Sequence, residues 1–121
     1  MISLIRTTSD NEDFRMLISE LDRTLLEQYK DRQAIYDRYN IIDNNRNVIV
    51  AYYKDIAAGC GCFKKFNDQS VEIKRMFVKP EYRGKKIGAL ILEALENWAR
   101  ELNVFSTVLE TGSKQIEAIH L

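Results

Sequence analysis

The sequence predicts a single α+β domain of three layers, in which an antiparallel meander leads into a β–α–β crossover with a parallel last strand. Three predicted strands, residues 48–54, 59–66 and 71–78, are separated by short turns and form the meander, and the first of them is rich in β-branched and aromatic residues. After the only proline, an apolar face over residues 87–102 predicts a long helix, and residues 104–110 predict the strand that follows. This order implies a right-handed crossover, with the last strand parallel to the one before the helix.

Before the meander, the sequence predicts a strand and an amphipathic helix. Residues 2–7 alternate weakly between apolar and polar side chains, which favours a first strand. Ser9 and Glu12 fit a capping box, in which a hydroxyl and a carboxylate satisfy free backbone amides at a helix start. Further helical turns are expected over residues 32–38. The apolar stripe of the first helix repeats at three- and four-residue spacing and consists of Phe14, Leu17, Ile18, Leu21 and Leu25.

Turns are predicted where residues tolerate unusual backbone angles. Residues 43–47 and 67–70, rich in Asn and Asp, are typical of turns, and residues 55–58 are expected to form a tight connection. Asn103 is expected to end the long helix. Residues 111–113 are expected to open a final helix that continues to the last residue.

Composition and charge exclude several classes of protein. The chain has 121 residues, 45% of them apolar and 30% charged, which suits one globular domain over residues 1–121 and not a disordered protein. The 18 basic and 18 acidic residues cancel, so general nucleic-acid binding is not expected. No apolar run approaches the ~18 residues that cross a bilayer, and the N-terminus lacks a signal-peptide pattern. We therefore expect a cytoplasmic protein without a membrane partner.

The two cysteines are expected to be buried core residues. Cys60 and Cys62 are one residue apart on one face of a predicted strand, a spacing at which a disulfide would be strained. Two thiols alone also make a poor metal site. The sequence therefore predicts no metal centre and a reducing environment.

The most informative stretch is residues 76–89, where a predicted strand enters a basic, glycine-containing turn that becomes a helix N-terminus. First-turn amides lack intrahelical partners, and the helix dipole places partial positive charge there, so such a junction binds anions. Glycine lets a ligand approach the backbone closely, and basic side chains add charge. The alternative is an ordinary loop whose basic residues are simply solvated. The residues that supply these properties are Arg83, Gly84, Lys85, Lys86 and Gly88.

Residues 83–89, Arg-Gly-Lys-Lys-Ile-Gly-Ala, resemble the pyrophosphate-binding motif of the GNAT family of N-acetyltransferases, Gln/Arg-x-x-Gly-x-Gly/Ala. Arg83 takes the first position and Gly88 the last glycine, while Lys86 stands where the family usually has its first glycine. A backbone amide can serve there with any side chain whose backbone geometry fits. The resemblance covers nearly all 121 residues, because the other predicted elements also come in family order.

The resemblance implies a GNAT fold and acetyl-coenzyme A as the co-substrate, without a metal. The strand before the motif would splay from the next parallel strand, leaving a V-shaped opening for the thioester beside the pantetheine arm. A backbone amide near Phe77 would polarise the thioester carbonyl and stabilise the oxyanion of a tetrahedral intermediate. The residues expected to bind the pyrophosphate are Arg83, Gly84, Lys85, Lys86, Ile87, Gly88 and Ala89, and those expected beside the pantetheine are Met76, Phe77 and Val78.

The resemblance also implies a candidate general base. Glu72 lies eleven residues before Arg83, the offset at which histone-type members of the family carry a general-base glutamate. It would take the proton of the attacking amine directly or through a water. The alternative is a sheet carboxylate that faces solvent or pairs with Lys74 or Arg75.

A second candidate base is Glu110, at the end of the last predicted strand. Its alternative role is to cap the helix that starts at residues 111–112. The implied function is transfer of an acetyl group to a primary amine of a small molecule or peptide by direct attack. The alternatives are a coenzyme A-binding or regulatory module without competent catalysis, and a structural domain that binds nothing. The sequence leaves the acceptor and the oligomeric state open, a homo-oligomer included.

The predicted final helix ends at Leu121, where relatives usually continue. In the family a tyrosine that acts as general acid often follows, and two more strands complete the sheet. We therefore expect a truncated domain that lacks the C-terminal strands usual in the family and turns over poorly. The alternative is that another chain supplies these elements. No residue of this sequence is assigned the role of general acid.

Overall fold

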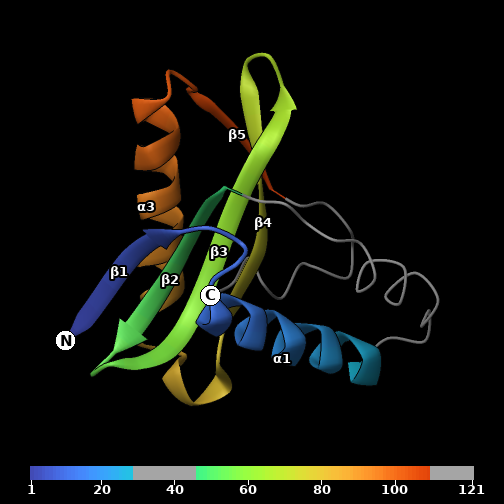
Figure 1. Cartoon of the computed structure of the whole chain (residues 1–121), viewed down its shortest axis with the longest axis vertical. Coiled ribbons are helices and arrows are strands. Elements are labelled where there is room, and N and C mark those ends of the chain that lie inside the picture. Colours follow the sequence, from blue (N-terminus) through green and yellow to red (C-terminus); the bar gives the residue numbers. More distant parts are fainter. Residues whose placement is uncertain (29–45, 110–121) are drawn as a thin grey trace.

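The computed structural model describes residues 1–28 and 46–109 (Figure 1). The strands and helices predicted within these residues are present. The helical turns predicted over residues 32–38, most of the turn predicted over 43–47 and the helix expected from residue 111 lie outside the described residues. The described elements, in chain order, are β1 (Ile2–Thr7), α1 (Glu12–Gln28), β2 (Asn47–Tyr53), β3 (Ile56–Asn67), β4 (Ser70–Val78), the 3₁₀ helix η1 (Pro80–Tyr82), α3 (Ile87–Glu101) and β5 (Ser106–Leu109).

The five described strands form one sheet in the order β1-β2-β3-β4-β5. The first four pair antiparallel, with registers such as Ile5 opposite Val50 between β1 and β2. β5 pairs with β4 in parallel after the crossover through α3. The predicted fold class, a meander followed by a crossover to a parallel last strand, is therefore confirmed.

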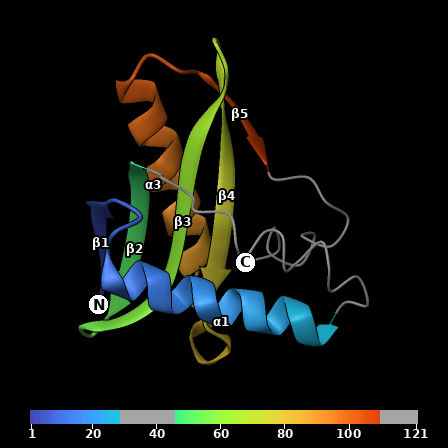
Figure 2. The same cartoon turned by 45° about the vertical axis from the view of Figure 1, so that its right-hand side comes forward.

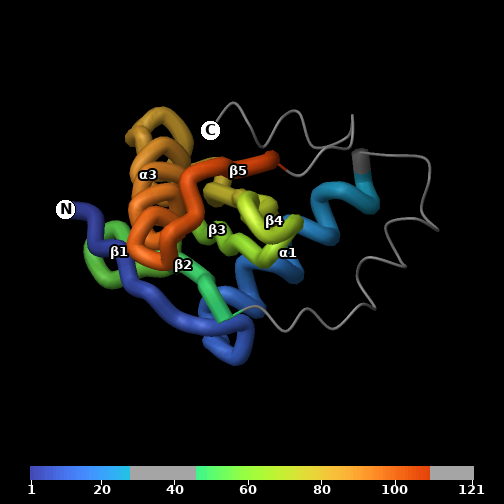
Figure 3. The backbone as a smooth tube through the Cα atoms, turned by 90° about the horizontal axis from the view of Figure 1, so that it is seen from above, coloured from blue at the N-terminus to red at the C-terminus, as the bar shows by residue number. Residues whose placement is uncertain are grey.

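The two α-helices cover opposite faces of the sheet, which gives the three predicted layers (Figures 2 and 3). Because strand side chains alternate, Phe77 of β4 belongs to the core under α1 and its neighbour Val78 to the core under α3. The core under α1 consists of Phe14, Leu17, Leu21, Leu25, Val48, Val50, Ala57, Cys60, Cys62 and Phe77. The core under α3 consists of Ile49, Ala51, Ala58, Phe63, Val71, Ile73, Val78, Ile87, Ile91, Leu95 and Ala99.

The start of α1 differs from the prediction. The helix is capped by Asn11, whose Oδ1 accepts a hydrogen bond from the Phe14 amide at 2.9 Å. The predicted capping box of Ser9 and Glu12 is therefore wrong. The Asn11 amide donates to the Thr8 carbonyl at 3.1 Å, so a turn follows β1 and delays the first helical residue until Glu12.

The connection between β2 and β3 is tighter than predicted. The chain turns through Lys54 and Asp55, whose φ angles are 50° and 70°, and β3 begins at Ile56. Positive φ at both central residues is the pattern of a type I′ turn, whose twist matches that of paired strands. The tight connection predicted over residues 55–58 is therefore wrong. The turn was placed too late in the sequence because neither of its central residues is the glycine that usually marks such a turn.

Two other predicted chain reversals are confirmed. Residues 67–70 connect β3 to β4 as a short hairpin. Asn103 ends α3 in the left-handed conformation, with φ 63°. The Val104 amide then donates to the Ala99 carbonyl at 2.9 Å, which closes a Schellman motif and satisfies a carbonyl of the last turn.

Side-chain links join the first two strands to the helices. Arg6 of β1 forms two hydrogen bonds with Glu101 of α3, one of them from Nη1 at 2.8 Å, and its guanidinium lies 4.7 Å from the ring centre of Trp98. Tyr52 of β2 donates its hydroxyl to Asp13 of α1 at 2.6 Å. Burial and this bond raise the pKa of Tyr52 to about 12, so the hydroxyl remains a donor at neutral pH.

Candidate functional site

The parallel strands β4 and β5 pair over only part of β4. Their register runs from Ser70 opposite Ser106 to Ile73 opposite Leu109, and β5 turns away from β4 toward its C-terminal end (Figure 2). Within residues 46–109, no strand pairs with Lys74–Val78 on this side. With respect to the described residues, the last part of β4 therefore has an open edge beside the turn that leads to α3.

Backbone groups of Val78 face this open edge. The following Lys79 amide donates to the Ala58 carbonyl of β3 at 2.9 Å, so by strand alternation the Val78 amide and carbonyl point away from β3. The Val78 carbonyl accepts a hydrogen bond from Nε of Arg83 at 3.1 Å. This bond ties the first residue of the motif to the end of β4.

The Met76 amide shares the direction of the Val78 amide. Both side chains pack against the core under α3, whereas the side chain of Phe77 belongs to the core under α1. Alternation therefore turns the Phe77 amide toward β3 and the Met76 amide toward the open edge. Of the backbone amides near Phe77, the Met76 amide is therefore the one that could donate to a ligand at the open edge of β4.

The first amides of α3 have no hydrogen-bond partner among residues 1–28 and 46–109. The helix N-cap is Lys86, with φ 64° and ψ 21°, and no side chain of the described residues caps the first turn. The first intrahelical bond runs from the Leu90 amide to the Lys86 carbonyl at 3.1 Å, which leaves the amides of residues 87–89 available. Gly84 has φ 85°, and a Cβ built on it would meet no atom within 4 Å, so the turn is open to a ligand there.

Lys86 adopts a backbone conformation that suits glycine. The left-handed region costs a residue with a Cβ about 1–2 kcal/mol. Replacement by glycine removes this cost but makes the unfolded chain more flexible, which offsets part of the gain in stability. We expect Lys86→Gly to raise the free energy of unfolding by about 0.5–1 kcal/mol, measured by urea denaturation. Lys85, whose φ is not positive, provides the matched control: Lys85→Gly is expected to give no gain. A loss of stability in Lys86→Gly would contradict the strain assigned to this position.

The side chain of Lys85 lies toward β2. Its ammonium is 5.0 Å from the ring centre of Tyr53, which also has the Lys54 ammonium 5.5 Å away and the Tyr82 ring centre at 5.6 Å. The position of Tyr53 beside Lys85 was not predicted. A tyrosine between two lysines leaves little trace in the pattern of a strand.

Glu72 lies on β4 in the part that pairs with β5. Its neighbours Val71 and Ile73 are buried in the core under α3, so alternation turns the half-exposed Glu72 side chain to the α1 face of the sheet. Among residues 1–28 and 46–109, the side chain of Glu72 forms no hydrogen bond or ion pair. Arg75, considered above as its partner, pairs with Asp22 instead. The other candidate, Glu110, lies outside the described residues.

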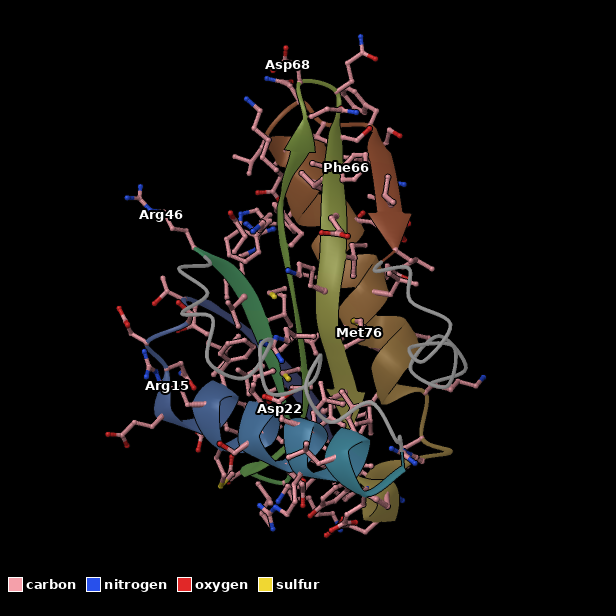
Figure 4. The ribbon with its side chains drawn as sticks, turned by 90° about the vertical axis from the view of Figure 1, so that its right-hand side faces the viewer. Arg15, Asp22, Arg46, Phe66, Asp68 and Met76 are labelled. Carbon is pink, nitrogen blue, oxygen red and sulfur yellow. The ribbon has the colours of Figure 1, made fainter. Side chains whose placement is uncertain are left out.

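The pairing of Asp22 with Arg75 joins α1 to β4. Arg75 Nη1 donates to Asp22 Oδ1 at 2.9 Å, and the two side chains are 6% and 2% exposed. Figure 4 shows Asp22 on α1 and Met76, the residue after Arg75, on β4. Sequence reasoning missed the pair, although Asp22 is a charged residue one position after Leu21 in the apolar stripe of its helix. That misplaced charge was the available signal.

Both cysteines are buried, as predicted, and they form no disulfide. Burial raises the pKa of the Cys60 thiol well above its usual value, so this thiol is neutral at physiological pH. The described part of the chain contains no cluster of three or more potential metal ligands. Neither described α-helix is long and apolar enough to cross a membrane.

The chain resembles known proteins over almost its whole length. The model of the acetyltransferase (GNAT) family matches residues 14–121. An IAA acetyltransferase of Azospirillum brasilense is 31% identical over 122 residues, a match that covers 99% of this chain and 80% of the relative.

Solved structures share the fold. A putative acyl-CoA N-acyltransferase of Klebsiella pneumoniae is 26% identical, with a TM-score of 0.76 over 99% of this chain and 78% of that one. A Clostridium acetobutylicum structure, described as a predicted acetyltransferase with acetyl-CoA, is 18% identical, with a TM-score of 0.62 over 99% and 87% of the two chains. With the family model matching most of its residues, this protein belongs to the GNAT family of N-acetyltransferases.

Proposed function

We propose that this protein transfers an acetyl group from acetyl-coenzyme A to a primary amine by direct attack of the amine on the thioester. The observation that carries the proposal is the uncapped N-terminus of α3 beside the open edge of β4. A helix N-terminus binds a diphosphate, and a strand edge binds an extended arm. The short segment 79–86 holds the two next to each other.

In this proposal the two ends of the nucleotide thioester bind to different backbone groups. The pyrophosphate accepts hydrogen bonds from the amides of residues 87–89, and the open space at Gly84 admits its oxygens. Arg83 and Lys86 add positive charge at the same turn. The pantetheine arm pairs with the edge of β4 at Val78, much as an added strand does.

The bound arm brings the thioester carbonyl to the Met76 amide. Attack of the amine forms the new C–N bond and places negative charge on the carbonyl oxygen, which this amide stabilises. Collapse of the tetrahedral intermediate breaks the C–S bond, and coenzyme A leaves as the thiolate. The neutral, buried Cys60 thiol is a poor nucleophile, which supports direct transfer without an acetyl-cysteine intermediate.

The attacking amine must lose a proton, because amines are mostly protonated at neutral pH. We assign this proton to Glu72, whose side chain is half-exposed and makes no competing ion pair with a described residue. Transfer runs directly or through one water. Glu110 is the alternative base.

The comparisons support the co-substrate more than the acceptor. The Clostridium structure is described with acetyl-CoA, and the Azospirillum relative is named as an acetyltransferase. Both fit acetyl-coenzyme A as the donor for this chain. For the acceptor we propose the amine of a small molecule or a peptide, to be identified by assay.

A bulky residue at Gly88 is expected to obstruct the proposed pyrophosphate site. Gly88 is the second residue of α3, and its amide is one of those left without an intrahelical partner. We expect Gly88→Trp to weaken coenzyme A binding more than tenfold, measured by isothermal titration calorimetry, because the indole excludes the phosphate from these amides.

The matched control places the same side chain elsewhere on α3. Glu93 is exposed and lies beyond the first turn, so Glu93→Trp is expected to leave the dissociation constant within about twofold. Circular dichroism confirms that both variants are folded before titration. Unchanged affinity in a folded Gly88→Trp variant would show that the pyrophosphate does not bind at this turn.

The function itself is tested with acetyl-coenzyme A and a panel of amines, comprising polyamines, amino acids, aminoglycosides and lysine-containing peptides. We expect binding of coenzyme A together with an acetylated product detected by mass spectrometry. Binding without any product would favour the coenzyme A-binding module. A flat calorimetric trace would overturn the proposal.

A further inference from the structure

β4 carries a bulge just before the part with the open edge. Two of its residues, Arg75 and Met76, lie opposite the single residue Gly61 of β3. Arg75 has φ 56°, in the left-handed region that a residue with a Cβ rarely adopts. A bulge bends its strand and redirects the groups that follow. The direction of the Met76 amide therefore depends on how Arg75 is held.

The side chain of Arg75 is held by α1, which packs on the opposite face of the sheet from α3. Its Nη1 lies 2.9 Å from Asp22 Oδ1, and both side chains are almost fully buried. A buried ion pair must repay the loss of two hydration shells, so it is weak evidence for stability. Its role here is better explained as holding the strained backbone of Arg75 in one conformation.

The backbone of the bulge is held from β3 as well. The Cys60 thiol donates to the Arg75 carbonyl at 3.5 Å, and the Cys62 thiol donates to the Lys74 carbonyl at 3.5 Å. Both carbonyls are thus turned toward the face of the sheet that α1 covers. Side chain and backbone of the bulge are anchored on the same face.

We propose that Asp22 and Arg75 are positioning residues for acetyl transfer, which act by locking the β4 bulge so that the Met76 amide points at the thioester carbonyl. The inference rests on the proposed function. α1 packs on the face that Glu72 also faces, so the pair links that side of the sheet to the oxyanion donor. Neither residue needs to touch the substrate.

The test removes both charges together, because removing one partner of a buried ion pair is strongly destabilising. In Asp22→Asn/Arg75→Gln we expect coenzyme A affinity within about threefold of wild type, because the amides of α3 are unaffected. The KM for acetyl-coenzyme A should also stay within about threefold, while kcat falls at least tenfold. A purely structural role would lower activity only in proportion to the unfolded fraction.

An infrared measurement reads the hydrogen bond itself and needs no acceptor. Donation to a carbonyl weakens its double bond, so bound acetyl-coenzyme A labelled with ¹³C at the carbonyl should absorb at lower frequency than the free thioester. We expect the displaced band in wild type and its return toward the free position in the double variant. If the double variant does not fold, Arg75→Lys, which keeps the positive charge but lacks the planar guanidinium that reaches Asp22, carries the same expectation.

The matched control is the exposed ion pair at the other end of the sheet. Arg6→Gln/Glu101→Gln removes two charges between β1 and α3 and should leave the band displaced as in wild type. A displaced band that persists in the Asp22/Arg75 variant would overturn the inference. The inference would also be overturned if wild type binds acetyl-coenzyme A but shows no displaced band. In that case the proposed binding site would still hold. Absence of binding in wild type would overturn the proposed function and this inference together.

Discussion

Replacing Glu72 with glutamine is expected to lower kcat by about 100-fold while coenzyme A affinity stays within about threefold. Glutamine keeps the size of the side chain but cannot accept the proton of the attacking amine. General bases contribute about 10²–10⁴ in rate, and the residue lies outside the turn that would bind the pyrophosphate. Steady-state kinetics with the best amine of the panel gives kcat, and calorimetry gives the affinity.

Glu93→Gln provides the matched control for Glu72, because it makes the same chemical change on the exposed surface of α3. Its kcat is expected to stay within about twofold of wild type. A Glu72→Gln rate that is also within twofold would move the role to Glu110 or to a chain of waters. A large rise in the coenzyme A dissociation constant would instead show that Glu72 supports binding.

Adding one methyl group at Gly59 is expected to destabilise the fold by about 2–3 kcal/mol. A Cβ on this residue would lie 2.8 Å from the backbone oxygen of Phe77, and 3.1 and 3.2 Å from side-chain carbons of Val78 and Ile91. The carbonyl belongs to the sheet and cannot move without disturbing β4. Urea denaturation of Gly59→Ala should show the loss as a lower midpoint.

Gly61 on the same strand gives the comparison for Gly59. There the first atom met by a Cβ, at 2.5 Å, is the thioether sulfur of Met76, the end of a flexible side chain that can move aside. We expect Gly61→Ala to cost less than Gly59→Ala. Equal losses at the two positions would indicate that contact with α3, and not the β4 carbonyl, limits both.

Local patterns predicted most of the fold. α3 follows from apolar residues that repeat at three- and four-residue spacing, a pattern that is recognised without knowing what the helix packs against. Its end follows from the left-handed preference of Asn103. The type I′ turn at Lys54 and Asp55 was missed, because strand pairing imposes positive φ on residues that carry no signal for it. Tertiary context decided that backbone, not propensity.

The same distinction applies to the candidate site, because one part could be predicted from neighbouring residues and another part could not. The turn at residues 83–89 was recognised because its glycines and basic residues are neighbours in sequence. The bulge at Arg75 was not, because its conformation depends on Asp22, 53 positions away on another element. Long-range pairing of two charges inside a core leaves only one local clue, an aspartate in an apolar stripe.

The burial of Cys60 and Cys62 has a practical outcome for enzymology. The sequence contains two cysteines, and both are 0% exposed. A colorimetric thiol reagent added during turnover would therefore record released coenzyme with little background from the catalyst. In an enzyme-only sample, slow uptake of the same dye would time the opening of the hydrophobic interior.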